Sequence, residues 1–161
     1  MKKALFALLI FAGCSTSEEP NGPPRGNSGA RIVQDNLSFR AETLIMESFP
    51  VQLRTVVNVS NTGSAPVDLM FPDGCTVLIR VYRDEARTSL AYDMGRQMGC
   101  TLAIQQFRLT RDDVMEFNAP TISAATILGD SLPNATYYLT AVVRPNGKIV
   151  ELEAGSAPLA K

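Results

Sequence analysis

In this 161-residue chain, the clearest indication of fold class is the segment Val51-Gln-Leu-Arg-Thr-Val-Val-Asn-Val59. Its side chains alternate in character, with Val51, Leu53, Thr55, Val57 and Val59 on one face and Gln52, Arg54 and Asn58 on the other. Successive side chains of a β-strand point to opposite faces, so this alternation is typical of a strand with one buried face. The stretch therefore predicts a half-buried β-strand.

Similar short apolar patterns, separated by turn residues, extend over most of the chain. The expected strands lie within residues 37–46, 67–71, 75–82, 100–109, 114–117, 136–144 and 148–152, and residues 121–128 form either a strand or the return limb of a loop. Pro145-Asn-Gly147 is the strongest hairpin signal, because Asn-Gly readily adopts the positive φ angles of a tight turn. No segment shows a helical stripe, so we predict an all-β fold, an antiparallel β-sandwich of about seven to nine strands.

The first fourteen residues have the layout of an export signal. Lys2 and Lys3 precede the apolar run Ala4–Phe11, and the small residues Ala12-Gly13 lead to Cys14. A membrane-spanning helix needs about 20 apolar residues, roughly twice the length of this run. The Phe11-Ala12-Gly13-Cys14 tetrad resembles the lipobox of bacterial lipoproteins, with Phe11 where Leu is more common. The resemblance implies that Cys14 is diacylated and becomes the mature N-terminus; an ordinary cleaved signal is the alternative.

The expected organisation follows from this signal and from composition. Residues 1–13 are the signal peptide, and residues 14–30, rich in Pro, Gly and Ser, are the lipidated N-terminus and a flexible linker. Residues 31–155 form the β-sandwich domain and residues 156–161 a C-terminal tail. The lipid would hold the protein on a membrane of the cell envelope. Ser15 is compatible with delivery to an outer membrane if the organism has one.

Charge and residue content exclude several classes of function. The chain has 15 basic residues, of which Lys2 and Lys3 leave with the signal, against 16 acidic ones, so nucleic acid is disfavoured as a partner. With no histidine there is no Ser-His-Asp triad and no His-based metal site. The carboxylate pairs Asp84-Glu85 and Asp112-Asp113 are predicted to serve in turns. We expect no enzyme activity, cofactor or metal.

Two cysteines remain for the domain once Cys14 is assigned to the anchor. An even number of cysteines in an exported chain is typical of a disulfide, so we expect Cys75 and Cys100 to be bonded, with buried free thiols as the alternative. The strand pattern of residues 75–82 places Cys75 on the core side. Such a bond would stabilise the fold by roughly 3–4 kcal/mol.

A family resemblance begins at the turn after the opening strand. Its motifs are the Asn58-Val-Ser-Asn61 turn before Pro66-Val67, then Phe71-x-x-Gly74, and then Val81-Tyr82-x-Asp84. Residues 51–152 resemble the BsuPI-like domain, a family named for an intracellular proteinase inhibitor. The resemblance implies an immunoglobulin-like sandwich and, as one function, inhibition of a proteinase. The family has a Trp-containing segment where this chain has Leu90-Ala-Tyr-Asp93.

A candidate contact loop lies just before the second domain cysteine. Met94-Gly-Arg-Gln-Met-Gly99 presents Arg96 between glycines and ends at Cys100. A loop held by a disulfide loses less entropy on binding, so Arg96 is a possible contact to a protease; an ordinary mobile connection is the alternative.

These observations lead to three functional hypotheses. The first is a membrane-anchored lipoprotein whose non-enzymatic β-sandwich binds a partner protein in the cell envelope through edge strands and end loops. The second is a proteinase inhibitor that acts through an exposed loop. The third is a structural or accessory subunit of an envelope assembly.

Overall fold

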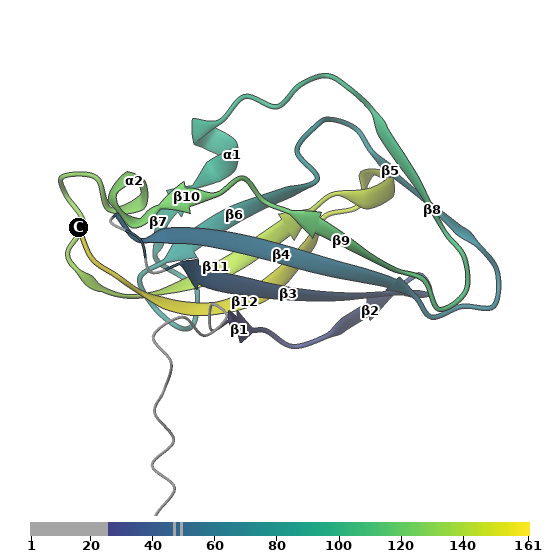
Figure 1. Cartoon of the computed structure of the whole chain (residues 1–161), viewed down its shortest axis with the longest axis horizontal. Helices are drawn as coiled ribbons and strands as arrows, with labels where there is room; N and C mark the ends of the chain where they lie inside the picture. Colours follow the sequence, from purple (N-terminus) through teal and green to yellow (C-terminus); the bar gives the residue numbers. More distant parts are fainter. Residues whose placement is uncertain (1–25, 47, 49) are drawn as a thin grey trace, which may run out of the picture.

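The computed structural model describes residues 26–46, 48 and 50–161 (Figure 1). The predicted signal peptide, Cys14 and residues 15–25 of the expected linker lie outside this part of the chain. No helix among the described residues is long and apolar enough to cross a membrane.

The described residues form twelve strands in antiparallel sheets, which confirms the predicted all-β sandwich. The first sheet has the order β1-β3-β4-β10, with β2 also pairing with β3 and β9 with β4. The second has the order β12-β11-β6-β7, and β5 pairs with β8 alone. The strands are β1 (Gly26–Ser28), β2 (Ile32–Gln34), β3 (Leu37–Met46), β4 (Gln52–Asn61), β5 (Val67–Phe71), β6 (Val77–Tyr82), β7 (Leu90–Asp93), β8 (Gln105–Leu109), β9 (Val114–Asn118), β10 (Ile122–Ser123), β11 (Ala135–Val143) and β12 (Val150–Leu159).

The side chains of β4 that the sequence predicted to face the core are buried in the structure. Leu53, Thr55, Val57 and Val59 all face the core. Thr55 can be buried because its hydroxyl lies 3.0 Å from that of Thr43, its neighbour on β3, so each polar group has a partner. Val56 is also buried, although it lies on the other face. The core of the sandwich is therefore built around the strand on which the sequence prediction was based.

Three features differ from the sequence predictions. Residues 121–128 form the two-residue strand β10 and then the helix α2 (Ala124–Leu128), which begins where the Ser123 hydroxyl accepts a hydrogen bond from the Thr126 N–H. A second helix, α1, spans Met94–Gln97. Both helices are too short to produce a periodic stripe in the sequence. The expected strand over residues 100–109 begins only at Gln105.

The domain boundaries also differ from those expected. Strand β12 continues to Leu159, and Ala157 and Leu159 are buried, so most of the expected tail belongs to the sandwich. At the other end β1 begins at Gly26, inside the expected linker, and pairs with β3. Short Gly- and Ser-rich strands have little apolar content, so local composition assigned these residues to a linker.

The predicted hairpin between residues 144 and 150 joins β11 and β12. Its turn is a 3₁₀ segment, η1 (Pro145–Gly147), in which Asn146 and Gly147 have φ angles of 54° and 75°. The sequence predicted a turn here because Asn-Gly readily adopts positive φ angles, and both residues have them.

One edge of the sandwich is closed where β1 meets β12. The Asn27 side-chain amide donates to the Ser156 carbonyl at 2.6 Å. Gly29 lies so close to β12 that an added Cβ would be 1.7 Å from the Glu153 carbonyl oxygen. A second close contact occurs at Gly155, whose φ is 84° and whose added Cβ would be 2.4 Å from that of Asn27. Both sheets therefore share this edge through backbone packing that only glycine permits.

We predict that Gly29→Ala destabilises the domain by about 1–3 kcal/mol, because the new methyl group must displace β12 backbone. Gly99→Ala is the matched control, since an added Cβ there meets nothing within 4 Å. Denaturant unfolding followed by circular dichroism measures both. Equal unfolding free energies for the two variants would contradict the close packing of β1 on β12.

Candidate functional site

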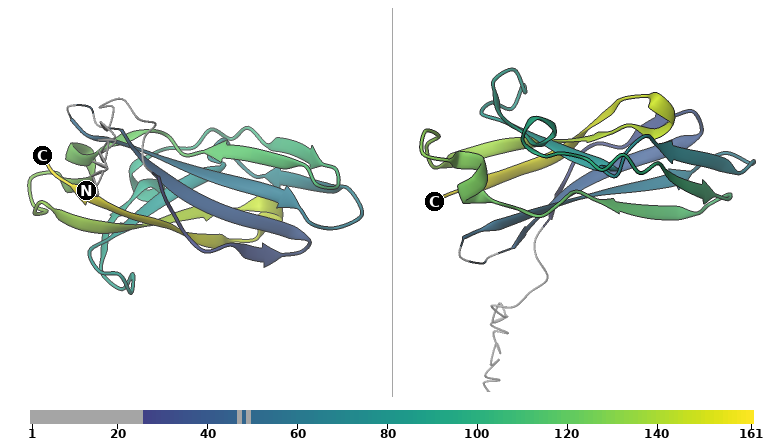
Figure 2. Two further views of the ribbon diagram at one scale, coloured as in Figure 1. Left: turned by 60° about the horizontal axis from the view of Figure 1, so that its bottom comes forward. Right: turned by 90° about the horizontal axis from the view of Figure 1, so that it is seen from above.

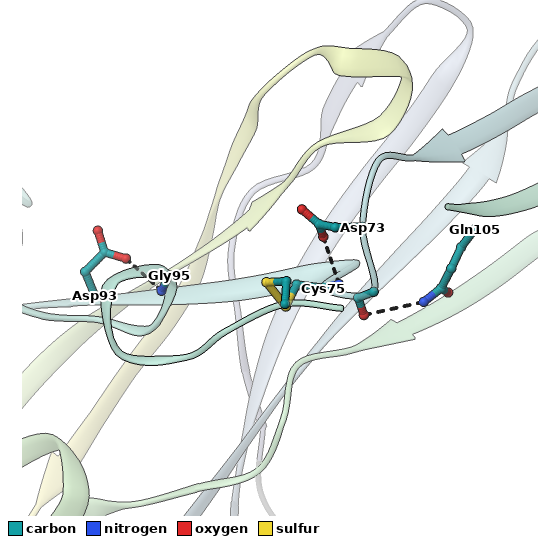
Figure 3. The surroundings of a disulfide bond; sticks show 7 residues. Asp73, Cys75, Asp93, Gly95 and Gln105 are labelled. Carbon is teal, nitrogen blue, oxygen red and sulfur yellow. Dashed lines mark hydrogen bonds between the residues drawn. A yellow bond between two sulfur atoms is a disulfide. The ribbon is translucent and has the colours of Figure 1, made fainter. Parts of the chain in front are cut away.

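The expected disulfide joins Cys75 and Cys100 (Figure 3). Cys75 lies in the connection from β5 to β6, and Cys100 lies in the connection from α1 to β8. Both residues are half-buried and pack against the hydrophobic core. The bond therefore fixes the long connection after α1 to the beginning of β6.

Hydrogen bonds next to the disulfide hold the same two segments together. The Gly74 N–H donates to the Thr101 carbonyl at 2.9 Å, and the Gln105 side-chain amide donates to the Gly74 carbonyl at 3.4 Å. The Asp73 carboxylate accepts from the Cys75 N–H at 2.9 Å. A Cβ at Gly74 would lie 2.1 Å from the Thr101 hydroxyl oxygen, so the Thr101 side chain packs directly against Gly74.

The other end of the connection is held by α1. The Asp93 carboxylate accepts a hydrogen bond from the Gly95 N–H at 3.0 Å and so caps the helix. Met94 is fully buried, which anchors the helix on the core. We call residues 94–104 the pinned loop, because a buried side chain holds its beginning and the disulfide holds it at Cys100.

Arg96, the predicted contact residue, lies in α1 and its side chain is 77% exposed. Its guanidinium lies 3.6 Å from the Asp93 carboxylate, which also contacts Arg80 at 3.4 Å. Arg96 is therefore accessible, but it is part of a helical turn and not of the irregular loop that the sequence suggested.

Beyond Arg96 the pinned loop exposes three apolar side chains. Leu102 is 95% exposed, Ile104 63% and Met98 38%. The sequence predicted a strand over residues 100–109 that includes Leu102 and Ile104, but the strand begins only at Gln105. Leu102 and Ile104 precede β8 and pair with no strand in the described part of the chain, and their side chains reach solvent. Exposed apolar groups held in a fixed place are typical of protein contact sites.

A small cleft lies at the end of the sandwich where the β2–β3 and β11–β12 hairpins meet. It has a volume of about 130 Å³ and is lined by Gln34, Asp35, Leu37, Phe39, Val67, Pro145, Asn146, Lys148 and Val150. At its mouth the Lys148 ammonium donates to the Asp35 carboxylate at 2.6 Å, and this bond lowers the pKa of Asp35. Sequence reasoning missed this cleft, because it forms between hairpins that are distant in the chain.

One carboxylate of each acidic pair, that of Asp84 and that of Asp113, accepts hydrogen bonds within a turn, as predicted. Asp84 accepts hydrogen bonds from the Thr88 N–H, the Ser89 N–H and the Thr88 hydroxyl, and these bonds, led by that of the Thr88 N–H, lower its pKa. Asp113 accepts from the hydroxyl and the N–H of Thr110, and its pKa is lowered for the same reason.

One group of possible metal ligands occurs within the described residues, formed by Asp73, Cys75 and Cys100. A cysteine binds metal as a thiolate, and both sulfur atoms here are joined in the disulfide. The group therefore cannot offer thiolate ligands while the disulfide is intact.

No protein-family model and no curated protein matches this chain. The resemblance to the BsuPI-like family accordingly stays a prediction, as do its immunoglobulin-like topology and its inhibitory function.

We predict that replacing both cysteines by serine lowers the free energy of unfolding by up to about 3–4 kcal/mol, because the unfolded chain regains the freedom of the closed loop. The same change should increase the rate of tryptic cleavage at Arg96. The wild-type protein under reducing conditions is the control and should behave in the same way. Unchanged stability and unchanged cleavage would mean that α1 and the hydrogen bonds at Gly74 hold the loop without the disulfide.

Proposed function

We propose that the protein is a membrane-anchored lipoprotein of the cell envelope whose non-enzymatic β-sandwich binds a partner protein through the pinned loop. The anchor part rests on the signal and lipobox pattern that ends at Cys14. The binding part rests on one observation above all, which is the exposure of Leu102 and Ile104 next to the disulfide.

The exposed apolar side chains of the loop would contribute favourable free energy to binding. Burying an exposed Leu or Ile side chain contributes about 1.5–3 kcal/mol. The disulfide removes part of the conformational freedom that binding would otherwise have to remove, so more of this energy appears as affinity. Leu102 and Ile104 would then be the central anchors of the interface, with Met98 beside them.

The position of the loop favours a protein partner over the membrane that holds the lipid. The chain enters the domain at β1, on one edge of the first sheet, whereas β9 lies on the opposite edge in the order β1-β3-β4-β9. In Figure 1 β1 lies at the bottom, and α1 and the chain that leads to β8 lie at the top. The right-hand view of Figure 2 looks at the molecule from that upper side. About a dozen residues separate Cys14 from β1 and span at most roughly 40 Å, so a tether there would hold the β1 edge within that distance of the bilayer, and the loop lies on the other side of the domain.

A second candidate function is proteinase inhibition, and the exposure of Arg96 favours it. Arg96 is on the same pinned loop, and its guanidinium contacts only the half-buried Asp93 among the described residues. An exposed basic side chain on a held loop suits the pocket of a trypsin-like protease.

We predict that the mature protein incorporates a labelled fatty acid in cells and that Cys14→Ala abolishes the label. The thiol of Cys14 is the group to which the diacylglyceryl unit would be attached. Cys75→Ser is the control, because it removes a different cysteine and should leave the label in place. Incorporation that persists in Cys14→Ala would refute the lipid anchor.

We predict that the double variant Leu102→Asp, Ile104→Asp loses at least tenfold of its binding to the partner, since two charged groups would have to be buried at the contact. The measurement is co-purification from membranes with the full mature chain, quantified by mass spectrometry. Val33→Asp is the matched control, because Val33 is equally apolar, 62% exposed and on the opposite edge.

Two results would change the assignment. Binding that is lost in Val33→Asp and retained in the double variant would place the contact on the other edge of the sandwich. If the co-purified protein is a protease and Arg96→Ala releases its inhibition, the second candidate function replaces the first.

A further inference from the structure

Strand β9 has one edge that pairs with no strand in the described part of the chain. On its inner edge it pairs with β4, from Ser60 opposite Val114 to Val56 opposite Asn118. Strand β8 precedes β9 directly in sequence, yet it pairs with β5. The rings of Phe107 on β8 and Phe117 on β9 pack edge to face, with centroids 5.1 Å apart, which holds the two strands in contact through side chains instead of backbone.

The hydrogen bonds at both ends of β9 show which of its backbone groups face outward. The Ala119 N–H donates to the Thr55 carbonyl, and the Asn61 N–H donates to the Asp113 carbonyl. In an antiparallel ladder the N–H and C=O of one residue point to the same side, and successive residues alternate. Odd-numbered residues of β9 therefore face β4.

The backbone groups of Val114, Glu116 and Asn118 consequently point away from the sheet. No hydrogen bond within the described structure uses their N–H groups. An unpaired row of this kind is a template for a further strand.

We propose that the outer edge of β9 binds an extended segment of the partner protein, which joins the first sheet as an added strand. This inference rests on the proposed partner binding and specifies how the partner binds, by strand addition. Beyond β9, strand β10 pairs with β4 at Leu53 and Gln52 and ends the open edge. The added strand therefore has about the length of β9, five residues.

The side chains of β9 define the chemistry of that segment. On the core side Met115 is half-buried and Phe117 is buried, so the added strand needs apolar residues at alternate positions. On the outer face Glu116 lies 3.4 Å from Arg54 and stays about half exposed. A lysine or arginine opposite Glu116 complements this charge. The partner segment is thus an alternating apolar and polar peptide with a basic residue at its centre.

The same charge argues against a second copy of this chain as the occupant. Two β9 strands that pair antiparallel over their whole length would place Glu116 directly opposite Glu116 of the other copy. Like charges in that position destabilise a strand pair. Strand β9 also lies on the edge opposite β1, where the tether enters, so a segment of another protein has free access to it.

Hydrogen exchange tests the geometry in the full mature chain. The amides of Val114, Glu116 and Asn118 should exchange much faster than those of Met115 and Phe117, because only the latter two are hydrogen-bonded to β4. As a probe we would add a synthetic peptide with the sequence of residues 52–60, which has the required alternation and carries an arginine. The peptide should slow exchange at the three outward amides. Equal exchange rates along β9 without peptide, or no protection with it, would overturn the proposal.

Proline substitution separates the backbone contact from the side-chain contact. Glu116→Pro removes an outward N–H and leaves the bonds to β4 intact, so it should fold and reduce peptide binding at least tenfold. Glu116→Ala keeps the N–H and should weaken binding by only a few-fold. Val114→Pro, at the end of the strand, is the second proline variant if Glu116→Pro does not fold. Full peptide binding by a folded proline variant would refute strand addition.

The two proposals can fail separately. If Leu102→Asp, Ile104→Asp abolishes co-purification of a partner while a folded Glu116→Pro variant retains it, the loop binds and β9 does not. If the peptide binds β9 but no protein is retained from membranes, the edge of β9 can accept an added strand, but the proposed partner binding is wrong.

Discussion

Packing of three phenyl rings determines how the parts of this domain are placed. Phe71 of β5, Phe107 of β8 and Phe117 of β9 lie with ring centroids 5.1–6.0 Å apart. They join the β5–β8 pair to the first sheet through side chains, at a place where backbone hydrogen bonds would otherwise be expected. Because β8 is held in this way, the edge of β9 stays open and the chain before β8 must pass outside both sheets.

The chain that passes outside the sheets is the pinned loop, and its two attachments have different chemistry. Burial of Met94 holds the beginning of the loop, and the bond between Cys75 and Cys100 holds it covalently just before Leu102 and Ile104. The exposed Leu102 and Ile104 thus have a defined position without being part of a strand. The loop and the outer edge of β9 lie on the side of the sandwich opposite β1, so both are available to the same partner.

Sequence patterns correctly predicted the structural features that depend on residues close together in the chain. The buried face of β4, the turn at Pro145–Gly147 and the pairing of the two cysteines all follow from local alternation, turn chemistry or cysteine count. The predicted strand over residues 100–109 is too long, because alternation of side chains does not reveal whether a segment has a strand to pair with. The open edge of β9 and the cleft at Asp35 and Lys148 depend on contacts between segments far apart, which no local pattern contains. The lipid anchor at Cys14 lies outside the described residues and stays a prediction.

The closed edge has a consequence for the order of folding. Asn27 and Ser156, which are 129 positions apart, are hydrogen-bonded where β1 meets β12. The two ends of the domain must therefore come together before the sandwich is complete, and contacts of such long range slow folding. A growing chain cannot make this contact until Ser156 has been synthesised. Closure of this edge therefore comes late in the folding of the domain.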